Sequence, residues 1–303
     1  MRVLLTGASS FTGLWFARAL AAAGHEVVAP LRGARYDDPL RRFRVDEAAK
    51  AAALIPSAPF GSDAFLKLIA EHGPFDVLCH HAAEAANHKS PDFDVQGAVS
   101  ANTLNLDKVL DAARAAGVKR LVATGSAFEE GEGRGAQPLR AFSPYGLSKT
   151  LTSRLLETAA DKAGLDHVKF VIPNPFGPYE GQTFQRFVMS AWRAGRPVHV
   201  SHPLYGRDNV PVDLLALSYV QAAQGKAGAH VSPSFYAGLT GDFFTRMAAE
   251  IAPRTGWDCA LTLADSQSFD EPQDRFNLQP LDAKALGWSE SAFWDAYALE
   301  GGR

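Results

Sequence analysis

Cysteine is scarce in this chain of 303 residues, which has only Cys79 and Cys259. The two lie far apart and neither belongs to a C-x-x-C pair, so neither a disulfide framework nor a zinc site is expected. Long apolar runs are also missing, because no stretch approaches the roughly 20 residues that a membrane span needs. The run Val3–Leu5 near the N-terminus is too short for a signal peptide. We therefore expect a cytoplasmic protein that carries no metal.

An excess of charge of one sign is missing as well. The 30 basic residues nearly balance the 33 acidic ones, and the net charge is −3. This balance gives no reason to expect a nucleic-acid partner or an anionic membrane surface. Hydrophobic residues make up 47% and charged residues 21%, which is ordinary for a globular protein. The length allows two lobes.

Short apolar runs alternate with helical patterns over the first two thirds of the chain. This repetition predicts an α/β fold with a doubly wound parallel sheet of the Rossmann type. The expected strands are Val3–Leu5, Glu26–Ala29, Phe75–His80, Lys119–Thr124 and His167–Ile172. The expected helices are Phe11–Ala23, Phe65–Glu71, Val95–Ala116 and Ser143–Lys162, with a short helical face at Ala48–Ala53.

The pattern changes after Pro173, where Pro and Gly become frequent and the expected helices shorten. We expect residues 1–173 to form a dinucleotide-binding domain, rejoined by about 207–226. Residues 174–303 are expected to form a smaller mixed lobe that binds the substrate. Its expected elements are helices at Phe184–Ala194, Val212–Ala223, Phe243–Ile251 and Ser289–Ala298, and strands at Val198–Val200 and Ala260–Leu263.

A glycine-containing loop, Thr6–Gly13, joins the first expected strand to the first expected helix. At this junction a dinucleotide's pyrophosphate meets backbone N–H groups and the positive end of a helix dipole. Gly7 permits a tight turn and Gly13 permits close helix–sheet packing. Ser10 occupies the position where the usual G-x-x-G-x-x-G has its middle glycine, and its hydroxyl could donate to a phosphate. The alternative is a plain strand–helix turn.

The end of the second strand bears on the choice of nicotinamide cofactor. NAD enzymes usually carry an acidic residue there to hold the ribose hydroxyls. Here the position reads Leu31 and is followed by Arg32, with Arg35 nearby. Because a guanidinium binds a 2′-phosphate in a bidentate manner, we favour NADP(H) over NAD(H). The alternatives are that Arg32 stacks on adenine without a phosphate, or that Asp37 or Asp38 returns to the ribose.

Tyr145 and Lys149 lie four residues apart on one face of an expected helix, which Ser143 caps. A phenol is a poor acid or base near neutral pH, but an adjacent ammonium is expected to lower its pKa. Tyr145 would then exchange a proton with a substrate oxygen during hydride transfer. Ser126 follows the preceding strand, at the edge of a parallel sheet where ligands bind, and would orient that oxygen. The alternative for Ser126 is a serine that caps a turn.

Together these segments resemble the extended short-chain dehydrogenase/reductases of the NAD-dependent epimerase/dehydratase family, which act mostly on nucleotide sugars. The resemblance covers nearly the whole chain, and within Thr6–Gly13 only Ser10 departs from the family's loop. It implies that Ser126, Tyr145 and Lys149 are the catalytic residues.

The resemblance also implies cofactor contacts beyond the loop. His80-His81-Ala82-Ala83 looks like the family's H-x-A-A strand end, Asn102 like the helix asparagine that follows it, and Pro173–Pro178 like R-x-x-N-x-Y-G-P. The implied cofactor contacts are Gly7, Ser9, Ser10, Phe11, Thr12, Gly13, Arg32, His81, Ala82, Ala83, Asn102, Thr124, Tyr145, Lys149, Pro173 and Phe176.

On the substrate side, Arg207–Asp213 is similar to the family's RDxIHVDD segment, whose arginine binds a diphosphate. A guanidinium fork suits that role. The implied substrate contacts are Ser126, Asn174, Arg186, Arg207 and Arg275. The resemblance further implies a homodimer, formed through the helices expected at Val95–Ala116 and Ser143–Lys162.

Departures from the family pattern narrow the expected reaction. Sugar 4,6-dehydratases have Thr-Asp-Glu where this chain reads Ser126-Ala127-Phe128, so dehydration is not expected. Two reactions remain. The first is reduction of a 4-keto nucleotide sugar by NADPH, which Arg32 favours. The second is C4 epimerisation with a tightly held NAD. Reduction of a non-sugar ketone is a further alternative.

Several polar residues could suggest a metal site or an acid pair, but we expect structural or solvent-exposed roles for them. His80 and His81 are adjacent on a strand, so they face opposite sides and do not share a metal easily. Glu129 and Glu130 replace part of the family's usual V-Y-G, and we expect them in a solvated loop rather than as an acid pair. Adenine recognition is expected to rest on backbone and packing, because Pro59 or Phe60 stands where relatives often carry aspartate.

Overall fold

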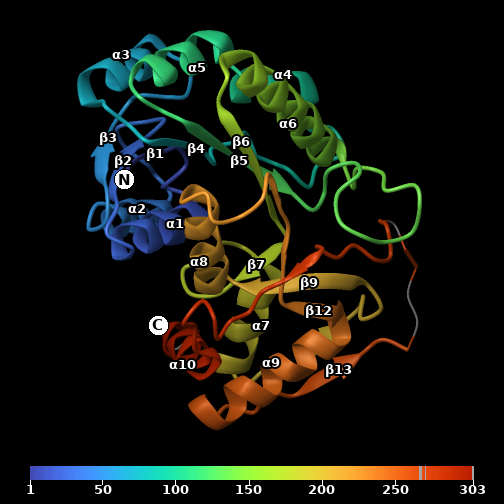
Figure 1. Ribbon diagram of the computed structural model, residues 1–303. Coiled ribbons are helices and arrows are strands. Elements are labelled where there is room, and N and C mark those ends of the chain that lie inside the picture. The colour runs from blue at the N-terminus through green and yellow to red at the C-terminus, as the bar shows by residue number, and fades with distance from the viewer. Residues whose placement is uncertain (266–267, 270, 302–303) are drawn as a thin grey trace. The chain divides into compact units, whose positions relative to one another are not determined.

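The computed structural model describes residues 1–265, 268–269 and 271–301 and divides into two compact units. The first unit comprises Met1–Glu132, Arg140–Ile172 and Ala216–Val231, and the second comprises Gly133–Leu139, Pro173–Leu215 and Ser232–Arg303. Figure 1 shows the course of the chain through both. The assignment of cofactor to one unit and substrate to the other stays a prediction.

The first unit is built on a seven-stranded sheet in the order β10-β6-β5-β4-β1-β2-β3, with every adjacent pair parallel. This confirms the predicted α/β fold of the Rossmann type. Strands such as Val77–His80 are wholly buried, as expected of parallel strands covered on both faces. The strands are β1 (Arg2–Leu5), β2 (Glu26–Pro30), β3 (Ala53–Ile55), β4 (Val77–His80), β5 (Arg120–Ser126), β6 (Asp166–Ile172) and β10 (His230–Val231).

Helices cover both faces of this sheet. Figure 1 shows α3, α4, α5 and α6 over one face and α1, α2 and α8 over the other. Phe16 of α1 stacks on Tyr219 of α8 at 3.9 Å, and both contact Phe170 of β6. The helices are α1 (Phe11–Ala22), α2 (Pro39–Ala48), α3 (Asp63–His72), α4 (Val95–Asn102), α5 (Leu106–Ala115), α6 (Pro144–Ala163) and α8 (Val212–Ala223), which continues from the second unit.

The single helix predicted over Val95–Ala116 is wrong, because the chain breaks between α4 and α5. Asn105 adopts a left-handed conformation with φ 51°, which asparagine tolerates better than most residues. Its Nδ2 donates to the carbonyl of Gly61 at 2.9 Å. The break places the C-terminus of α4 beside the end of β4, where the Asn102 carbonyl contacts His80 Nε2 at 3.0 Å.

The helical face predicted at Ala48–Ala53 is also wrong. Helix α2, which the sequence analysis did not predict, ends at Ala48, and Ala53 begins β3. The helix starts where Asp38 caps it by accepting from the Arg41 N–H at 2.5 Å, with Pro39 in the first turn.

The described residues of the second unit form small sheets and the helices α7, α9 and α10, together with the start of α8. Its core holds large aromatic side chains, including Trp192, Trp294 and Tyr297, all nearly or fully buried. The strands are β7 (Asn174–Phe176), β8 (Val198–Val200), β9 (Gly206–Pro211), β11 (Pro233–Ser234), β12 (Tyr236–Leu239), β13 (Leu261–Leu263) and β14 (Gln279–Pro280). The helices are α7 (Phe184–Arg193), α9 (Thr240–Thr255) and α10 (Glu290–Gly301).

Candidate active site

The loop between β1 and α1 has the close packing that a pyrophosphate cradle needs. Gly7 has φ +82°, and a Cβ there would lie 2.9 Å from the Ala82 backbone nitrogen. A Cβ on Gly13 would lie 2.1 Å from the Gly7 carbonyl oxygen. Any side chain at either position would therefore clash with backbone. The N-terminus of α1 follows at Phe11, so the N–H groups of Phe11 and Thr12, which precede the capped Gly13 N–H, can meet an anion. These features fit a dinucleotide.

Ser10 caps this helix. Its Oγ accepts from the Gly13 N–H at 3.0 Å and also contacts His81 Nε2 at 3.1 Å. The hydroxyl is thus engaged by protein groups, whereas the sequence analysis considered it as a phosphate donor. Ser10 therefore shapes the loop by fixing the start of α1.

His81 ties the loop to two neighbouring strands. Its Nε2 contacts Thr12 Oγ1 at 3.0 Å, and its Nδ1 contacts Thr124 Oγ1 at 3.2 Å. Burial, with a smaller contribution from Lys149, lowers the pKa of His81 to about 3, so the ring is neutral. The His81 ring is therefore held by hydrogen bonds through both of its nitrogens, next to the Thr6–Gly13 loop.

His80 faces the other side of the sheet, as the strand alternation predicts. It contacts Thr6 Oγ1 at 3.2 Å and stacks on Phe60, and burial lowers its pKa to about 4. Within the described residues, no group of three or more His, Cys, Asp or Glu side chains could hold a metal ion.

Asn102 positions the segment that follows β4. Its Oδ1 accepts from the Glu84 N–H at 2.7 Å, and its Nδ2 donates to Thr152 at 3.4 Å. The Ala82 N–H in turn donates to Thr6 Oγ1 at 2.9 Å. The side chain of Asn102 is buried, so these bonds fix the course of Ala82 and Ala83 past the cradle.

Two arginines lie on the side of the cradle where the second strand ends. The predicted cation, Arg32, is exposed and pairs with Glu84 at 2.8 Å. Arg41, which the sequence analysis missed, donates through Nε and Nη2 to Ser9 Oγ at 3.3 and 3.2 Å. Its guanidinium lies 4.8 Å from the Tyr36 ring centroid. The Asp38-Pro39 start of α2 was the available signal, because Arg41 follows it within the first turn.

Ser126 is the last residue of β5, and Tyr145 and Lys149 lie in the first two turns of α6. Ser143 caps α6 by accepting from the Gly146 N–H at 3.3 Å, as predicted. Lys149 is buried and donates to the Thr124 carbonyl at 2.6 Å. Ser126 Oγ accepts from the Phe128 N–H at 3.2 Å.

The Tyr145 ring lies between two other rings. The centroids of His88 and Phe93 are 5.6 and 5.7 Å from it, both edge-on. Burial, with a smaller contribution from the Glu129 carboxylate, raises the pKa of Tyr145 to about 12. The net shift is upward, opposite in direction to the lowering expected from Lys149. The lysine's own pKa is lowered by burial, while Glu129 opposes that shift.

The remaining predicted residues belong to the second unit. Asn174 donates to Asn209 Oδ1 at 2.6 Å, and Arg186 pairs with Glu300 at 2.8 Å. The Phe176 ring is fully buried against Phe243 and Phe293, which leaves only its backbone to a ligand. Pro173 precedes β7.

Arg207 and Arg275 lie together around Gly206. Arg207 Nη1 donates to the Gly206 and Gln273 carbonyls at 2.9 and 2.8 Å, and Nη2 pairs with Glu271 at 3.0 Å. The Arg275 N–H donates to the Gly206 carbonyl at 3.0 Å, and the residue is 2% exposed. Arg207 is therefore the more accessible cation of the two.

A family model described as the NAD dependent epimerase/dehydratase family matches residues 3–208, about two thirds of the chain. The chain belongs to this family. The protein is therefore an NAD(P)-dependent oxidoreductase or epimerase of the extended short-chain dehydrogenase/reductase type, as the resemblance implies.

Solved structures of low sequence identity share the fold. A UDP-glucuronic acid 4-epimerase from Bacillus cereus, in complex with UDP-glucuronic acid and NAD, is 18% identical with a TM-score of 0.73, covering 100% of this chain and 99% of that one. A UDP-glucose 4-epimerase from Thermotoga maritima is 20% identical with a TM-score of 0.71, covering 100% and 98%. A dTDP-glucose 4,6-dehydratase from Streptomyces venezuelae is 19% identical with a TM-score of 0.71, covering 99% and 96%.

A shorter match involves a curated protein, a 2'-dehydrokanamycin reductase from Streptomyces kanamyceticus. It is 39% identical over 89 residues, which is 28% of this chain and 23% of that protein. The chain thus matches about a quarter of that relative's length. In the described part of the chain, no helix is both long enough and apolar enough to span a bilayer.

Glu129 stands where the family usually has V-Y-G, and its burial differs from our expectation. We expected a solvated loop, but Glu129 is 0% exposed. Its Oε1 accepts from the Ser126 N–H at 2.8 Å, and its Oε2 pairs with Lys169 Nζ at 2.6 Å. Only Glu130 of the two is exposed. This burial was not predictable from the local sequence, because Lys169 lies on a different strand.

Proposed function

We propose that this family member is an NADP(H)-dependent reductase of a 4-keto nucleotide sugar. The observation that carries the proposal is that Lys149 of α6 donates to the Thr124 carbonyl of β5, two residues before Ser126, with Tyr145 one turn earlier on the same helix. A keto reduction needs a proton donor at the carbonyl oxygen, whereas alcohol oxidation needs a base. Ala127 and Phe128 occupy the positions where a dehydratase carries its acids, so the site supports no competing loss of water.

The bound nicotinamide would supply the hydride. Ser126 Oγ accepts from the Phe128 N–H, so its own hydrogen is directed to the substrate oxygen. Tyr145 then gives its proton to that oxygen as negative charge develops there. Lys149, held on the Thr124 carbonyl, would stabilise the phenolate left behind. Proton return from solvent to Tyr145 completes the cycle.

The preference for NADP(H) rests on Arg41 together with Arg32. Arg41 lies against Ser9 in the phosphate loop, and Leu31 is a buried apolar residue where NAD enzymes carry an acid. A 2′-phosphate would replace the Ser9 hydroxyl as the partner of the Arg41 guanidinium. We expect Arg41→Ala to weaken NADP binding by about 10- to 100-fold, a typical loss for a charge-assisted contact, with little effect on NAD. Arg42→Ala, on the exposed face of the same helix, is the matched control.

Arg207 supports the nucleotide part of the proposed substrate. Its guanidinium lies 4.4 Å from the Tyr205 ring centroid and is held by backbone carbonyls. A diphosphate would compete with Glu271 for Arg207 Nη2.

A second candidate substrate, a keto sugar without a nucleotide, is favoured by the short match to 2'-dehydrokanamycin reductase. Arg207→Ala would weaken binding of a nucleoside diphosphate only if the substrate is a nucleotide sugar.

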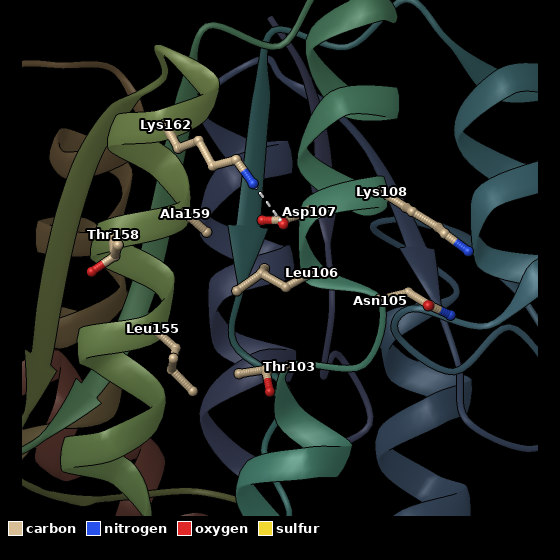
Figure 2. A pocket seen from close by; sticks show the side chains of 9 residues that line it. All are labelled: Thr103, Asn105, Leu106, Asp107, Lys108, Leu155, Thr158, Ala159 and Lys162. Atoms are coloured by element: carbon tan, nitrogen blue, oxygen red, sulfur yellow. Dashed lines mark hydrogen bonds and ion pairs between the residues drawn. The ribbon is translucent and has the colours of Figure 1, made fainter.

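We also propose that the protein is a homodimer. Helix α6 exposes a stripe of Leu147, Leu151 and Leu155 at a spacing of four residues, which is one face of a helix. Beside this stripe, Figure 2 shows the groove between α5 and α6, in which Lys162 Nζ binds Asp107 at 2.8 Å. Exposed leucines in a row are typical of an interface. Sedimentation should show a dimer that Leu151→Asp converts to monomer, whereas a monomeric wild type would contradict this.

Thermal stabilisation by NAD, NADP and a panel of nucleoside diphosphates tests the proposal before any substrate is known. A ligand that binds only the native state raises the unfolding midpoint. We expect NADP to raise the midpoint more than NAD, and one nucleoside diphosphate to add to the effect. Stabilisation by NAD alone, with NAD carried through purification, would instead favour the epimerase alternative.

A further inference from the structure

The His81 residue joins three segments of the first unit. Its Nε2 contacts Ser10 Oγ at 3.1 Å and Thr12 Oγ1 at 3.0 Å, at the start of α1. Its Nδ1 contacts Thr124 Oγ1 at 3.2 Å on β5, and its backbone N–H donates to Thr6 Oγ1 at 3.0 Å, just after β1. The ring therefore connects the loop that would hold a pyrophosphate to the strand that ends at the predicted catalytic serine.

Both nitrogens of the His81 ring are engaged by hydroxyl groups of the protein. A neutral imidazole has one N–H group and one lone pair, whereas a hydroxyl group can either donate or accept. In either tautomer the ring can therefore bind Thr124 on one side and the loop on the other. The direct cofactor contact that the family resemblance implied for His81 would require one of these bonds to break.

Packing also fixes the position of the ring. The Phe16 ring lies edge-on to it, with 4.9 Å between the centroids. On the loop side, a Cβ on Gly7 would lie 3.1 Å from His81 Cδ2. The loop backbone thus lies directly against the imidazole, so a shift of the loop must displace the ring or break its hydrogen bonds.

Thr124 links this ring to the predicted catalytic residues. The Thr124 carbonyl accepts from Lys149 Nζ at 2.6 Å, while the Thr124 hydroxyl contacts His81. Ser126 ends the same strand two residues later. Thr124 is buried, so the histidine and the lysine are bound by the side chain and the backbone of one fixed residue.

We propose that His81 is a positioning residue that couples the Thr6–Gly13 loop to the end of β5, so that cofactor binding and the placement of Lys149 depend on each other. The inference needs the family's nicotinamide dinucleotide, but neither the proposed 4-keto substrate nor the preference for NADP(H). The pyrophosphate, which NAD and NADP share, is the part that this loop would hold. Loss of the ring should therefore weaken both cofactors alike, whereas Arg41→Ala should affect NADP alone.

A merely structural role for His81 predicts a different pattern. Removing the ring would then lower the unfolding midpoint of the free protein and leave the affinity of the folded protein for cofactor unchanged. Thr124→Val would have the same effect on binding whether or not the histidine is present, because the effects of independent sites add. Coupling through the ring predicts that the two effects do not add.

The test measures the Kd of NADPH and of NADH for the wild type, His81→Leu, Thr124→Val and the double variant. We expect His81→Leu to weaken both cofactors by about 3- to 10-fold, as loss of neutral hydrogen bonds would produce. Thr124→Val should weaken both by about 2- to 5-fold when His81 is present, and should have almost no further effect in His81→Leu. The unfolding midpoint of each free variant shows that the titrated protein is folded.

Two further variants keep the test decisive. His81→Gln places an amide group near the position of Nε2, so it should bind both cofactors more tightly than His81→Leu, and it replaces that variant if the apolar side chain folds poorly. Thr103→Val removes a hydroxyl group that donates to the Val99 carbonyl at 2.7 Å, and it should leave both Kd values unchanged.

Unchanged affinity in His81→Leu, or equal effects of Thr124→Val with and without His81, would overturn the inference. Tighter binding of NADH than of NADPH by the wild type would contradict the proposed cofactor preference alone, because additivity is judged for each cofactor separately.

Discussion

Two glutamates, one in each unit, are buried to the same degree but have different interaction partners. Glu129 and Glu180 are both 0% exposed. Glu129 binds a backbone N–H and the Lys169 ammonium. Glu180 is bound by the Tyr297 hydroxyl and by Thr183 Oγ1 at 2.8 Å, while the nearest guanidinium, Arg186, pairs with Glu300.

The two environments differ in what offsets the cost of burying a carboxyl group. Although burial opposes a charge on Lys169, the carboxylates of Glu129 and Glu132 raise the pKa of its ammonium, so the cluster is ionic. Burial raises the pKa of Glu180 to about 7, with the two hydroxyls only partly offsetting it. Partners rather than depth therefore decide whether a buried carboxyl is charged. In the first unit an ammonium offsets the burial of the carboxylates, whereas in the second unit hydroxyl groups offset it only partly.

The largest expected effect comes from removing the cation from the first cluster. Lys169→Met removes the ammonium that pairs with both Glu129 and Glu132 and leaves Glu132 with only His230, so we expect a loss of about 3–5 kcal/mol of unfolding free energy at neutral pH. Urea unfolding measures it. Lys162→Met, which removes an exposed partner of Asp107, should leave the midpoint almost unchanged. Equal effects of the two substitutions would contradict the comparison.

A smaller effect is expected from the pH dependence of Glu180. Because its folded pKa is above the unfolded value near 4.5, the folded state binds the extra proton between about pH 4.5 and 7. The contribution of Glu180 to the free energy of unfolding is then greatest below this pH window. It falls by up to about 3 kcal/mol as pH rises through the window, as expected for a pKa shift of this size. Glu180→Gln should remove this fall in unfolding free energy measured at pH 5 and pH 8. If the variant and the wild type lose stability in parallel, the carboxyl is charged after all.

The smallest effect concerns a hydroxyl partner of Glu180. Thr183→Ala removes the hydrogen bond from the Thr183 hydroxyl to Glu180. It also removes the N-cap of α7, in which Thr183 Oγ1 accepts from the Arg186 N–H at 3.1 Å. We expect a loss of about 1–2 kcal/mol, larger at pH 8 than at pH 5, because the ionised carboxylate depends more on the donor. Thr183→Ser retains both bonds and should stay near wild type. A loss that is the same at both pH values would assign the effect to the cap alone.

Most strands and helices of the first unit were predicted correctly, for physical reasons. Parallel strands and their helices repeat with a period that burial imposes, so β1, β4 and α6 were predicted nearly at their observed bounds. Local signals such as the Ser143 cap also held. The close approach of Gly7 and Gly13 to backbone agrees with the roles assigned to these glycines from the loop pattern.

What the sequence did not predict depends on partners far along the chain. The break at Asn105 rests on a bond to Gly61, and the burial of Glu129 rests on Lys169 from another strand. Arg41 reaches Ser9 only because α2 starts at Asp38. In the second unit, strands such as β7 and β9 contain Asn and Pro and lack the alternation that marks a strand.

Mixing NADPH with a panel of 4-keto nucleotide sugars tests the central claim most directly, with NADPH absorbance and product formation followed together. The account predicts that one NADPH is oxidised for each alcohol formed by the wild type. It also predicts that Tyr145→Phe lowers the rate by at least about 100-fold, the lower range of a positioned acid. Equal rates for both proteins, or inversion of a nucleotide sugar without consumption of NADPH, would contradict it.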